Sequence, residues 1–139
     1  MKFYVLIPVY KAEAFLKDCL DSVFAQTEQN FEVVLVDDGS PDASGAMCDR
    51  FAASDGRVHA LHQENTGPFG ARRAAIRYCL DHGDKADWAV FLDADDTLKP
   101  NALEVIDRTH QETQADLIFI GEDQVYGGKV FLIFMTEMS

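Results

Sequence analysis

Short apolar runs alternate along this chain with segments in which apolar residues recur every three or four positions. Each run is about as long as a strand and has few polar positions, which is typical of strands buried on both faces in a parallel sheet. The run at 57–62 is weaker and roughly alternating, so an edge position is expected for it. The predicted strands cover residues 3–9, 31–36, 57–62, 88–92 and 116–120.

The segments between these strands have the spacing of amphipathic helices. The helix after the second strand is expected to bury Met47, Cys48 and Phe51 on one face. Pro100 fits the first turn of the last helix, because its fixed φ suits that position and its missing N–H is not needed there. The other predicted helices cover residues 13–26 and 71–82, the second of them ended by Gly83.

The alternation of strand and helix predicts an α/β fold, in which right-handed βαβ units form a mostly parallel central sheet flanked by helices. Residues 125–135, with Gly127-Gly128 in the middle, predict a C-terminal β-hairpin. No linker, repeat or low-complexity segment is visible, so residues 1–139 are expected to form one domain. Ligands of such sheets bind beyond the carboxyl ends of the strands, where the polar clusters of this chain fall.

The most unusual cluster follows the strand at 88–92, where Asp93, Asp95 and Asp96 lie within four positions. Burial of the strand does not explain these carboxylates, and like charges so close repel unless a cation or water lies between them. Asp96 or Thr97 alone would be enough to cap the next helix. Oxygen ligands favour Mg²⁺ or Mn²⁺, and so few protein ligands leave coordination positions open for substrate phosphates. The sequence therefore predicts a divalent metal site here.

Two further clusters fall at the same expected edge. A carboxylate of Asp37-Asp38 could accept hydrogen bonds from a ribose or from the N–H of a base, although the segment also suits a strand-to-helix turn capped by Ser40 or Asp42. The loop at 63–70 opens a helix with Arg72 and Arg73 in its first turn. Basic residues there oppose the helix dipole, so one of them is a candidate to bind a diphosphate, and the other is expected to be a surface residue.

Composition narrows the classes of function. The net charge of −12 argues against a nucleic-acid partner, and no P-loop or G-x-G-x-x-G opens a helix, which excludes the usual ATPases and dinucleotide dehydrogenases. No apolar run is long enough for a membrane span, and no signal peptide is visible. Three cysteines without C-x-x-C spacing are interpreted as core residues. A cytoplasmic protein is expected.

Four motifs together resemble those of the family 2 glycosyltransferases, and their order and spacing match over about residues 3–120. They are residues 7–13 (IPVYKAE), 36–40 (VDDGS), 64–67 (ENTG) with Ala71-Arg72, and 91–96 (FLDADD). Each motif alone is weak, but four in register are specific. The resemblance implies a GT-A fold, which is Rossmann-like and carries a D-x-D motif, here Asp93-Ala94-Asp95. It also implies a nucleotide-diphosphate sugar donor, often a uridine one, and inversion at the anomeric carbon.

The family's residue roles transfer by position. The resemblance implies that Asp95 binds Mn²⁺ or Mg²⁺ bridging the donor phosphates and that Asp93, a second metal ligand, contacts the ribose or sugar; these two are the candidate catalytic residues. Ala94 between them would contact the nucleotide sugar. The remaining implied contacts are Pro8, Tyr10 and Glu13 around the nucleoside, Asp38 at the base, and Asn65 and Arg72 beside the nucleotide and diphosphate.

The chain departs from the family pattern at Lys11, where asparagine is usual, and at Phe69 and Arg73 beside the arginine. Family members are also usually longer. The resemblance therefore implies a donor-binding portion of a longer enzyme, with the catalytic base outside this chain and little transfer by this portion alone. The acceptor, whether glycan, lipid-linked or protein, is not indicated. The alternative is a non-catalytic nucleotide-sugar-binding module or inactive fragment.

Overall fold

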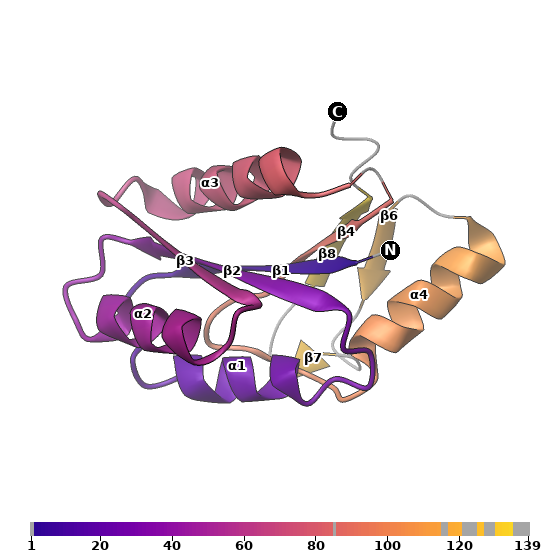
Figure 1. The fold of residues 1–139 in the computed structure, drawn as a ribbon, viewed down its shortest axis with the longest axis horizontal. Helices are drawn as coiled ribbons and strands as arrows, with labels where there is room; N and C mark the ends of the chain where they lie inside the picture. The colour runs from indigo at the N-terminus through magenta and orange to yellow at the C-terminus, as the bar shows by residue number, and fades with distance from the viewer. Residues whose placement is uncertain (1, 85, 115–116, 121–124, 127–129, 135–139) are drawn as a thin grey trace.

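The computed structural model describes residues 2–84, 86–114, 117–120, 125–126 and 130–134. Within these residues, one sheet has the strand order β3-β2-β1-β4-β8-β6 (Figure 1). Its first four strands run parallel and its last two run antiparallel to their neighbours. The parallel strands are β1 (Phe3–Val9), β2 (Phe31–Asp38), β3 (Val58–Gln63) and β4 (Trp88–Phe91). The predicted parallel sheet and the edge position of β3 are confirmed.

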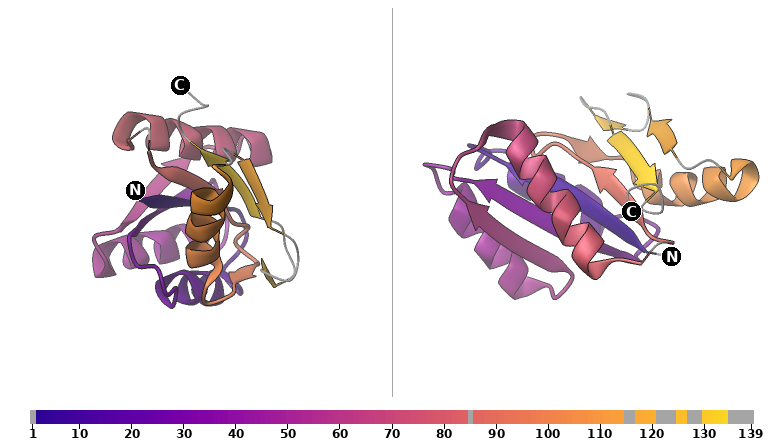
Figure 2. Two further views of the ribbon diagram at one scale, coloured as in Figure 1. Left: turned by 90° about the vertical axis from the view of Figure 1, so that its right-hand side faces the viewer. Right: turned by 90° about the horizontal axis from the view of Figure 1, so that it is seen from above.

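Helices cover both faces of this sheet. Figures 1 and 2 show α3 on one face and α1 and α2 on the other, with α4 beyond the β4 side. The helices are α1 (Leu16–Phe24), α2 (Ser44–Ser54), α3 (Gly67–His82) and α4 (Ala102–Thr113). The α/β architecture expected from the alternating pattern is therefore present.

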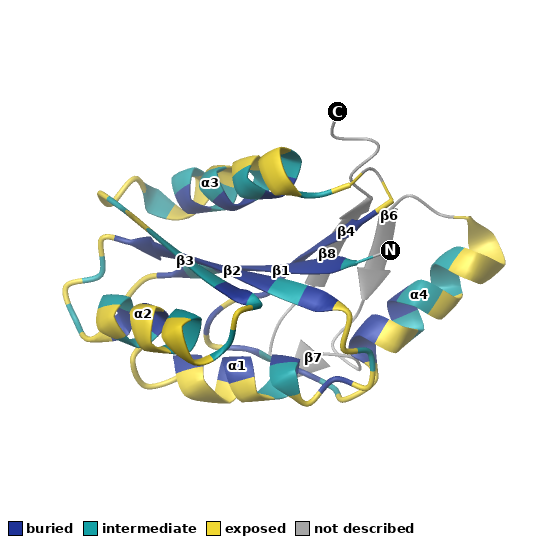
Figure 3. Cartoon of the chain, viewed as in Figure 1, coloured by how far each residue is buried: buried dark blue, intermediate teal, exposed yellow. Residues whose placement is uncertain are grey.

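Successive side chains of β1 enter two different cores, because side chains alternate across a strand. Val5 and Ile7 pack with the α1 and α4 side, whereas Tyr4 and Leu6 pack against α3. Figure 3 shows the resulting buried strands between helices that are exposed on their outer faces. The residues that α3 buries against the sheet are all small: Ala71, Ala75 and Cys79. The cysteines Cys19, Cys48 and Cys79 are buried and unbridged, as predicted for core residues.

Several predicted helix limits are wrong, for reasons that lie in tertiary contacts. The first helix begins at Leu16 rather than residue 13, because the N–H groups of residues 11–13 hydrogen-bond to side chains of the segment before α2 and of its first residue. α3 begins at Gly67, four residues earlier than predicted, where the Asp38 carboxylate accepts its first N–H groups. Pro100 lies just before α4 and its N-cap residue Asn101, and not in the first turn.

The predicted C-terminal hairpin is also wrong. Its two strands form, as β7 (Val125–Tyr126) and β8 (Val130–Phe134), but β7 pairs with β5 (Thr97–Leu98), which the sequence did not predict. β8 instead enters the main sheet between β4 and β6 (Leu117–Ile120). Pairing with strands elsewhere in the sequence thus takes the place of pairing between the two. Gly127-Gly128 lies outside the described residues.

In the part of the chain that the structure describes, no helix combines the length and the apolar character that a membrane span requires.

Candidate functional site

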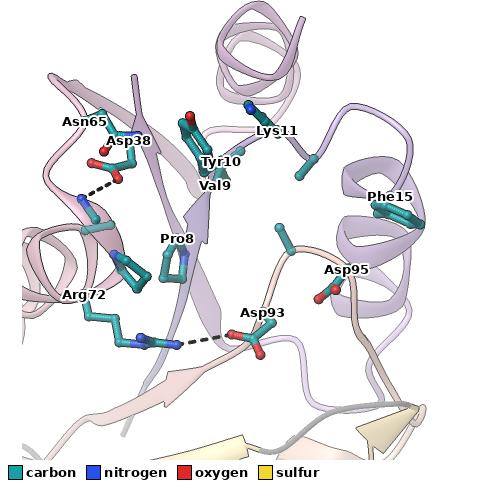
Figure 4. Close-up of a pocket in the computed structure, with 15 residues that line it drawn as sticks. Pro8, Val9, Tyr10, Lys11, Phe15, Asp38, Asn65, Arg72, Asp93 and Asp95 are labelled. Carbon is teal, nitrogen blue, oxygen red and sulfur yellow. Dashed lines mark hydrogen bonds and ion pairs between the residues drawn. The ribbon is translucent and has the colours of Figure 1, made fainter. Parts of the chain in front are cut away.

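The carboxyl ends of the parallel strands surround a cavity of about 450 Å³ (Figure 4). Its walls come from the end of β1, the end of β2, the loop and first turns of α3, and the turn after β4. This is the edge at which parallel sheets bind ligands. The site residues predicted from the sequence that line it are Pro8, Tyr10, Asp38, Asn65, Arg72, Asp93, Ala94 and Asp95. Glu13 is not among the lining residues.

The acidic segment after β4 is a tight turn, in which the N–H of Asp96 donates to the carbonyl oxygen of Asp93 over 3.0 Å. The turn brings one carboxylate oxygen from each of Asp93, Asp95 and Asp96 within 4.8 Å of one another. Asp93 and Asp95 are exposed to the cavity, and Asp96 lies beneath them, 5% exposed. The three carboxylates thus form one cluster and do not point separately into solvent.

Asp96 shows that the carboxylates of this group repel one another. No residue in the described segments donates a hydrogen bond to its buried carboxylate. Burial, and then the charges of Asp95 and Asp93, raise the pKa of Asp96 to about 6. A divalent cation among the three carboxylates would remove this repulsion, and oxygen-only ligands suit Mg²⁺ or Mn²⁺. The residues present therefore fit the metal that the sequence predicts, with Asp96 as a possible third contributor that the family motif did not indicate.

Arg72 is the arginine that faces the cavity. Its guanidinium lies 3.6 Å from Asp93 Oδ1, while Arg73 is exposed and does not line the cavity. Both arginines lie in the first turns of α3, and the small faces of Ala71 and Ala75 fix how that helix sits on the sheet. The sequence did not indicate which of the two arginines faces the ligand site, and the structure shows that Arg72 lines the cavity.

Asp38 is almost fully buried and holds the loop that leads into α3. Its Oδ1 accepts hydrogen bonds from the Gln63 side chain and from the backbone and hydroxyl of Thr66, and its Oδ2 accepts the N–H of Gly67. Burial alone would raise the pKa of Asp38, but these hydrogen bonds outweigh it and lower the pKa. The carboxylate therefore stays charged while it orders one wall of the cavity, a role that the sequence did not reveal.

Close packing at Gly39 places Asn65 next to Asp38. Gly39 has φ +70°, and a Cβ there would lie 2.8 Å from the backbone nitrogen of Asn65. Figure 4 shows Asn65 beside Asp38 at one end of the cavity, with Arg72 and Asp93 at another. Glycine is thus required for the loop to approach the end of β2.

Glu13 acts away from the cavity. Its carboxylate accepts the N–H of Ala43, the N-cap residue of α2, and its own N–H donates to Asp42. The structure thus places Glu13 in a contact between two segments of the fold. Seven cavity residues had no site role assigned from the sequence. Two of them have large side chains: Lys11, next to Tyr10, and Phe15, which is 52% exposed just before α1. An exposed aromatic residue cannot be recognised as such from periodicity alone.

Comparisons with known proteins identify the family of this chain. The family model described as glycosyl transferase family 2 matches residues 4–136. Glycosyltransferase GlyG of Streptococcus pneumoniae serotype 4 is 38% identical to this chain over 115 residues, which are 82% of this chain and 36% of GlyG. The chain thus spans about a third of the length of that curated relative.

Two solved structures have similar folds. Residues 1–349 of S. aureus TarS, in complex with UDP-GlcNAc, are 26% identical with a TM-score of 0.73, and the match covers 84% of this chain and 33% of that one. The mannosyltransferase PcManGT from Pyrobaculum calidifontis has a TM-score of 0.76 over 99% of this chain and 46% of its own, and at 17% identity it shows the fold alone. With the four motifs in register at one cavity, these matches show that the chain belongs to glycosyl transferase family 2.

Proposed function

We propose that this chain is the donor-binding portion of a metal-dependent glycosyltransferase. The enzyme would transfer a sugar from a nucleotide-diphosphate sugar, with a uridine donor favoured, to an acceptor hydroxyl. The observation that carries the proposal is one cavity with a group of three carboxylates at one end and an aromatic ring, an amide and a buried carboxylate at the other. Such a cavity fits a molecule with a metal-binding diphosphate and a flat base.

The relatives support the choice of donor. TarS, which is 26% identical over 84% of this chain, has been solved with UDP-GlcNAc. In this chain Tyr10 would face the base, Pro8 would line the nucleoside side, and Asn65 would lie beside the base or ribose. Asp38 has an acceptor position left on Oδ2, since among the described residues Gly67 alone donates to that oxygen. That position suits the N–H of a base.

The residues at the other end would hold the diphosphate and the sugar. Asp95 and Asp93 would hold the cation, which when bound neutralises charge on the departing diphosphate. Arg72, 3.6 Å from Asp93, is placed to exchange part of that contact for a phosphate oxygen. An acceptor hydroxyl, deprotonated by a carboxylate, would attack the anomeric carbon opposite the diphosphate, which inverts its configuration. We assign that base to no described residue.

Calorimetry with UDP, with and without Mn²⁺, tests the metal site directly. The comparison uses wild type, Asp95→Asn, and the control Asp81→Asn, which removes an equal charge from the exposed end of α3. We expect Mn²⁺ to strengthen UDP binding in wild type and the control, and Asp95→Asn to reduce that affinity by about tenfold or more, since metal ligands and their supports have effects of this size. Binding that is independent of Mn²⁺ and unchanged in Asp95→Asn would contradict the metal assignment.

Measuring the release of UDP from UDP-GlcNAc distinguishes an enzyme from a non-catalytic binding module. A glycosyltransferase transfers the sugar of UDP-GlcNAc slowly to water, or faster to an acceptor, and releases UDP. A non-catalytic module binds the donor and releases no UDP. Release of UDP should be measured on the longest natural form of the protein, with and without Mn²⁺. Tight, metal-dependent binding with no release under any condition would favour the module.

A further inference from the structure

We propose that Lys11 selects the base of the nucleotide, by donating a hydrogen bond from its ammonium to a carbonyl oxygen on the edge of the base. This proposal rests on the proposed function, since it assumes that a nucleotide diphosphate occupies the cavity. It assigns a specificity role to a residue at which this chain departs from the family motif. The expected preference is for a base with a carbonyl next to a ring N–H, as in uracil, over a base with an amino group there, as in cytosine.

The backbone of Lys11 is held in an unusual conformation. Its φ is +51°, in the left-handed region that residues other than glycine and asparagine seldom occupy. Three consecutive N–H groups fix it there: those of Lys11, Ala12 and Glu13 donate to the side chains of Ser40, Ser44 and Asp42. Local strain of this kind at a cavity wall is a reason to look for a function of the side chain.

The consequence of this conformation is the direction of the side chain. In a continuing strand, successive side chains point to opposite faces, so Lys11 would point away from Tyr10. The left-handed residue ends that alternation, and the Lys11 ammonium lies 5.3 Å from the centroid of the Tyr10 ring. Figure 4 shows both side chains at the same end of the cavity. A base stacked on Tyr10 would therefore have an ammonium near its edge.

The charges of the cavity point to the base rather than the diphosphate as the partner of Lys11. Of the two basic residues lining it, Arg72 lies against Asp93 at the end with the carboxylates. Among the described residues, Lys11 makes no ion pair, and its contact is the ring of Tyr10. Its ammonium is therefore available to a ligand, and the ring beside it marks the nucleoside end.

Hydrogen-bonding chemistry then gives the selectivity. An ammonium group can only donate, whereas the ionised Asp38 carboxylate can only accept. In this proposal Lys11 donates to the carbonyl oxygen of uracil and Asp38 accepts its N3–H, and guanine offers the same two groups in its O6 and N1–H. Cytosine presents an amino donor where uracil has its carbonyl, and its adjacent ring nitrogen is an acceptor. The amino group of cytosine would therefore face the Lys11 ammonium, donor against donor, and its ring nitrogen would face the Asp38 carboxylate, acceptor against acceptor.

The test compares UDP with CDP, which differ at that edge of the base. Affinities are measured by calorimetry with Mn²⁺ on wild type, Lys11→Met and the control Lys17→Met. Lys17 is an exposed lysine of α1 whose ion pair with Asp21 contributes little. We expect Lys11→Met to weaken UDP binding by about tenfold and CDP binding by less than about threefold, because a hydrogen bond to a charged group is lost with UDP alone. Lys17→Met should leave the ratio of the two affinities unchanged.

Other results would overturn the proposal. An equal loss for UDP and CDP would show a general attraction to phosphate, and an unchanged ratio would show that Lys11 does not contact the base. Lys11→Gly provides a second variant that suits the left-handed backbone; it should keep the melting temperature and lose the same discrimination. Failure of wild type to bind either nucleotide would contradict the proposed function and the role of Lys11 with it.

Discussion

Asp38 illustrates how one buried side chain can shape a binding site without depending on a ligand. It accepts four hydrogen bonds from residues 63–67, including the N–H groups at the start of α3. Asp38→Ala would leave two backbone N–H groups of this wall without their acceptor. The contact that orders the loop would be lost together with any contact to the base.

We therefore predict that Asp38→Ala lowers the free energy of unfolding by about 1–2 kcal/mol, the usual cost of removing a helix cap and leaving partly buried donors unpaired. Urea unfolding near neutral pH, where the carboxylate is fully charged, measures this loss. Asp81→Ala, at an exposed position of α3, is the control and should change stability by less than about 0.5 kcal/mol. A stability for Asp38→Ala equal to that of the control would show that the loop is ordered by other contacts.

The sequence identified most cavity residues but not what they do in the fold. The motifs led to eight residues that line the cavity, because strand ends are recognisable from apolar runs that stop at polar residues. Glu13 was placed in the nucleoside pocket by resemblance, yet its carboxylate caps the segment before α2. Asp38 and the residues it binds are more than twenty positions apart, as are Glu13 and Ala43. Such partners leave no mark on local periodicity.

At the scale of elements, the parallel strands and their helices were predictable and the C-terminal pairing was not. β1, β2 and β4 are buried on both faces, so each apolar run identifies its own strand, and the weaker β3 is recognisable from its rough alternation. β7 and β5 are two residues long, too short for any period to show. Whether Val125–Tyr126 pairs with the following strand or with Thr97–Leu98 depends on which edge is available in the folded sheet. That choice is made by tertiary structure.

Three glycines provide a test of whether the loop beside β2 requires glycine at position 39. Gly39 has both a positive φ and a neighbouring backbone that a Cβ would meet, Gly67 has a positive φ in open space, and Gly56 has neither. We expect Gly56→Ala to be neutral or slightly stabilising, Gly67→Ala to cost about 1–2 kcal/mol from backbone strain, and Gly39→Ala to cost more than Gly67→Ala. Chemical unfolding gives all three values.

Nucleotide binding adds a second readout to that series. Because Gly39→Ala would push against the backbone of Asn65, it should also weaken UDP binding, which Gly56→Ala should leave unchanged. Equal stabilities for the Gly39 and Gly67 variants would mean that the loop moves aside at little cost. The cavity wall would then be less rigid than the close approach indicates.

For the whole molecule, one histidine connects three elements of a strongly acidic chain. His62 of β3 lies between Asp37 at the end of β2 and Asp49 of α2, with ring nitrogen to carboxylate distances of 2.9 and 2.7 Å. Hydrogen bonds to Asp49 and then Asp37 raise the pKa of His62. Burial alone would raise the pKa of Asp37, but its bonds to His62 and Ser40 lower it. With a net charge of −12, a protonated His62 also reduces repulsion among the carboxylates.

These shifts predict how global stability depends on pH. Since the pKa of His62 is raised above its ordinary 6.5, its contribution is complete below that pH and is lost as the pH rises through the raised value. The contribution of Asp37 holds above its ordinary 3.8 and is lost only as the pH falls through its lowered pKa. The difference in unfolding free energy between wild type and His62→Gln should therefore be largest between these two values and should decrease in alkaline solution.

The size of this difference is limited by solvent, because the His62 side chain is 44% exposed and that of Asp49 is 65% exposed. We expect no more than about 1 kcal/mol near pH 5.5 and almost none near pH 9, measured by urea unfolding. Asp49→Asn should follow the same pH dependence, since it removes the first of the two partners. His82→Gln should not, because within the described residues that ring has no carboxylate partner. An effect of His62→Gln that stays constant with pH would mean that His62 stabilises the fold by packing, with no contribution from its charge.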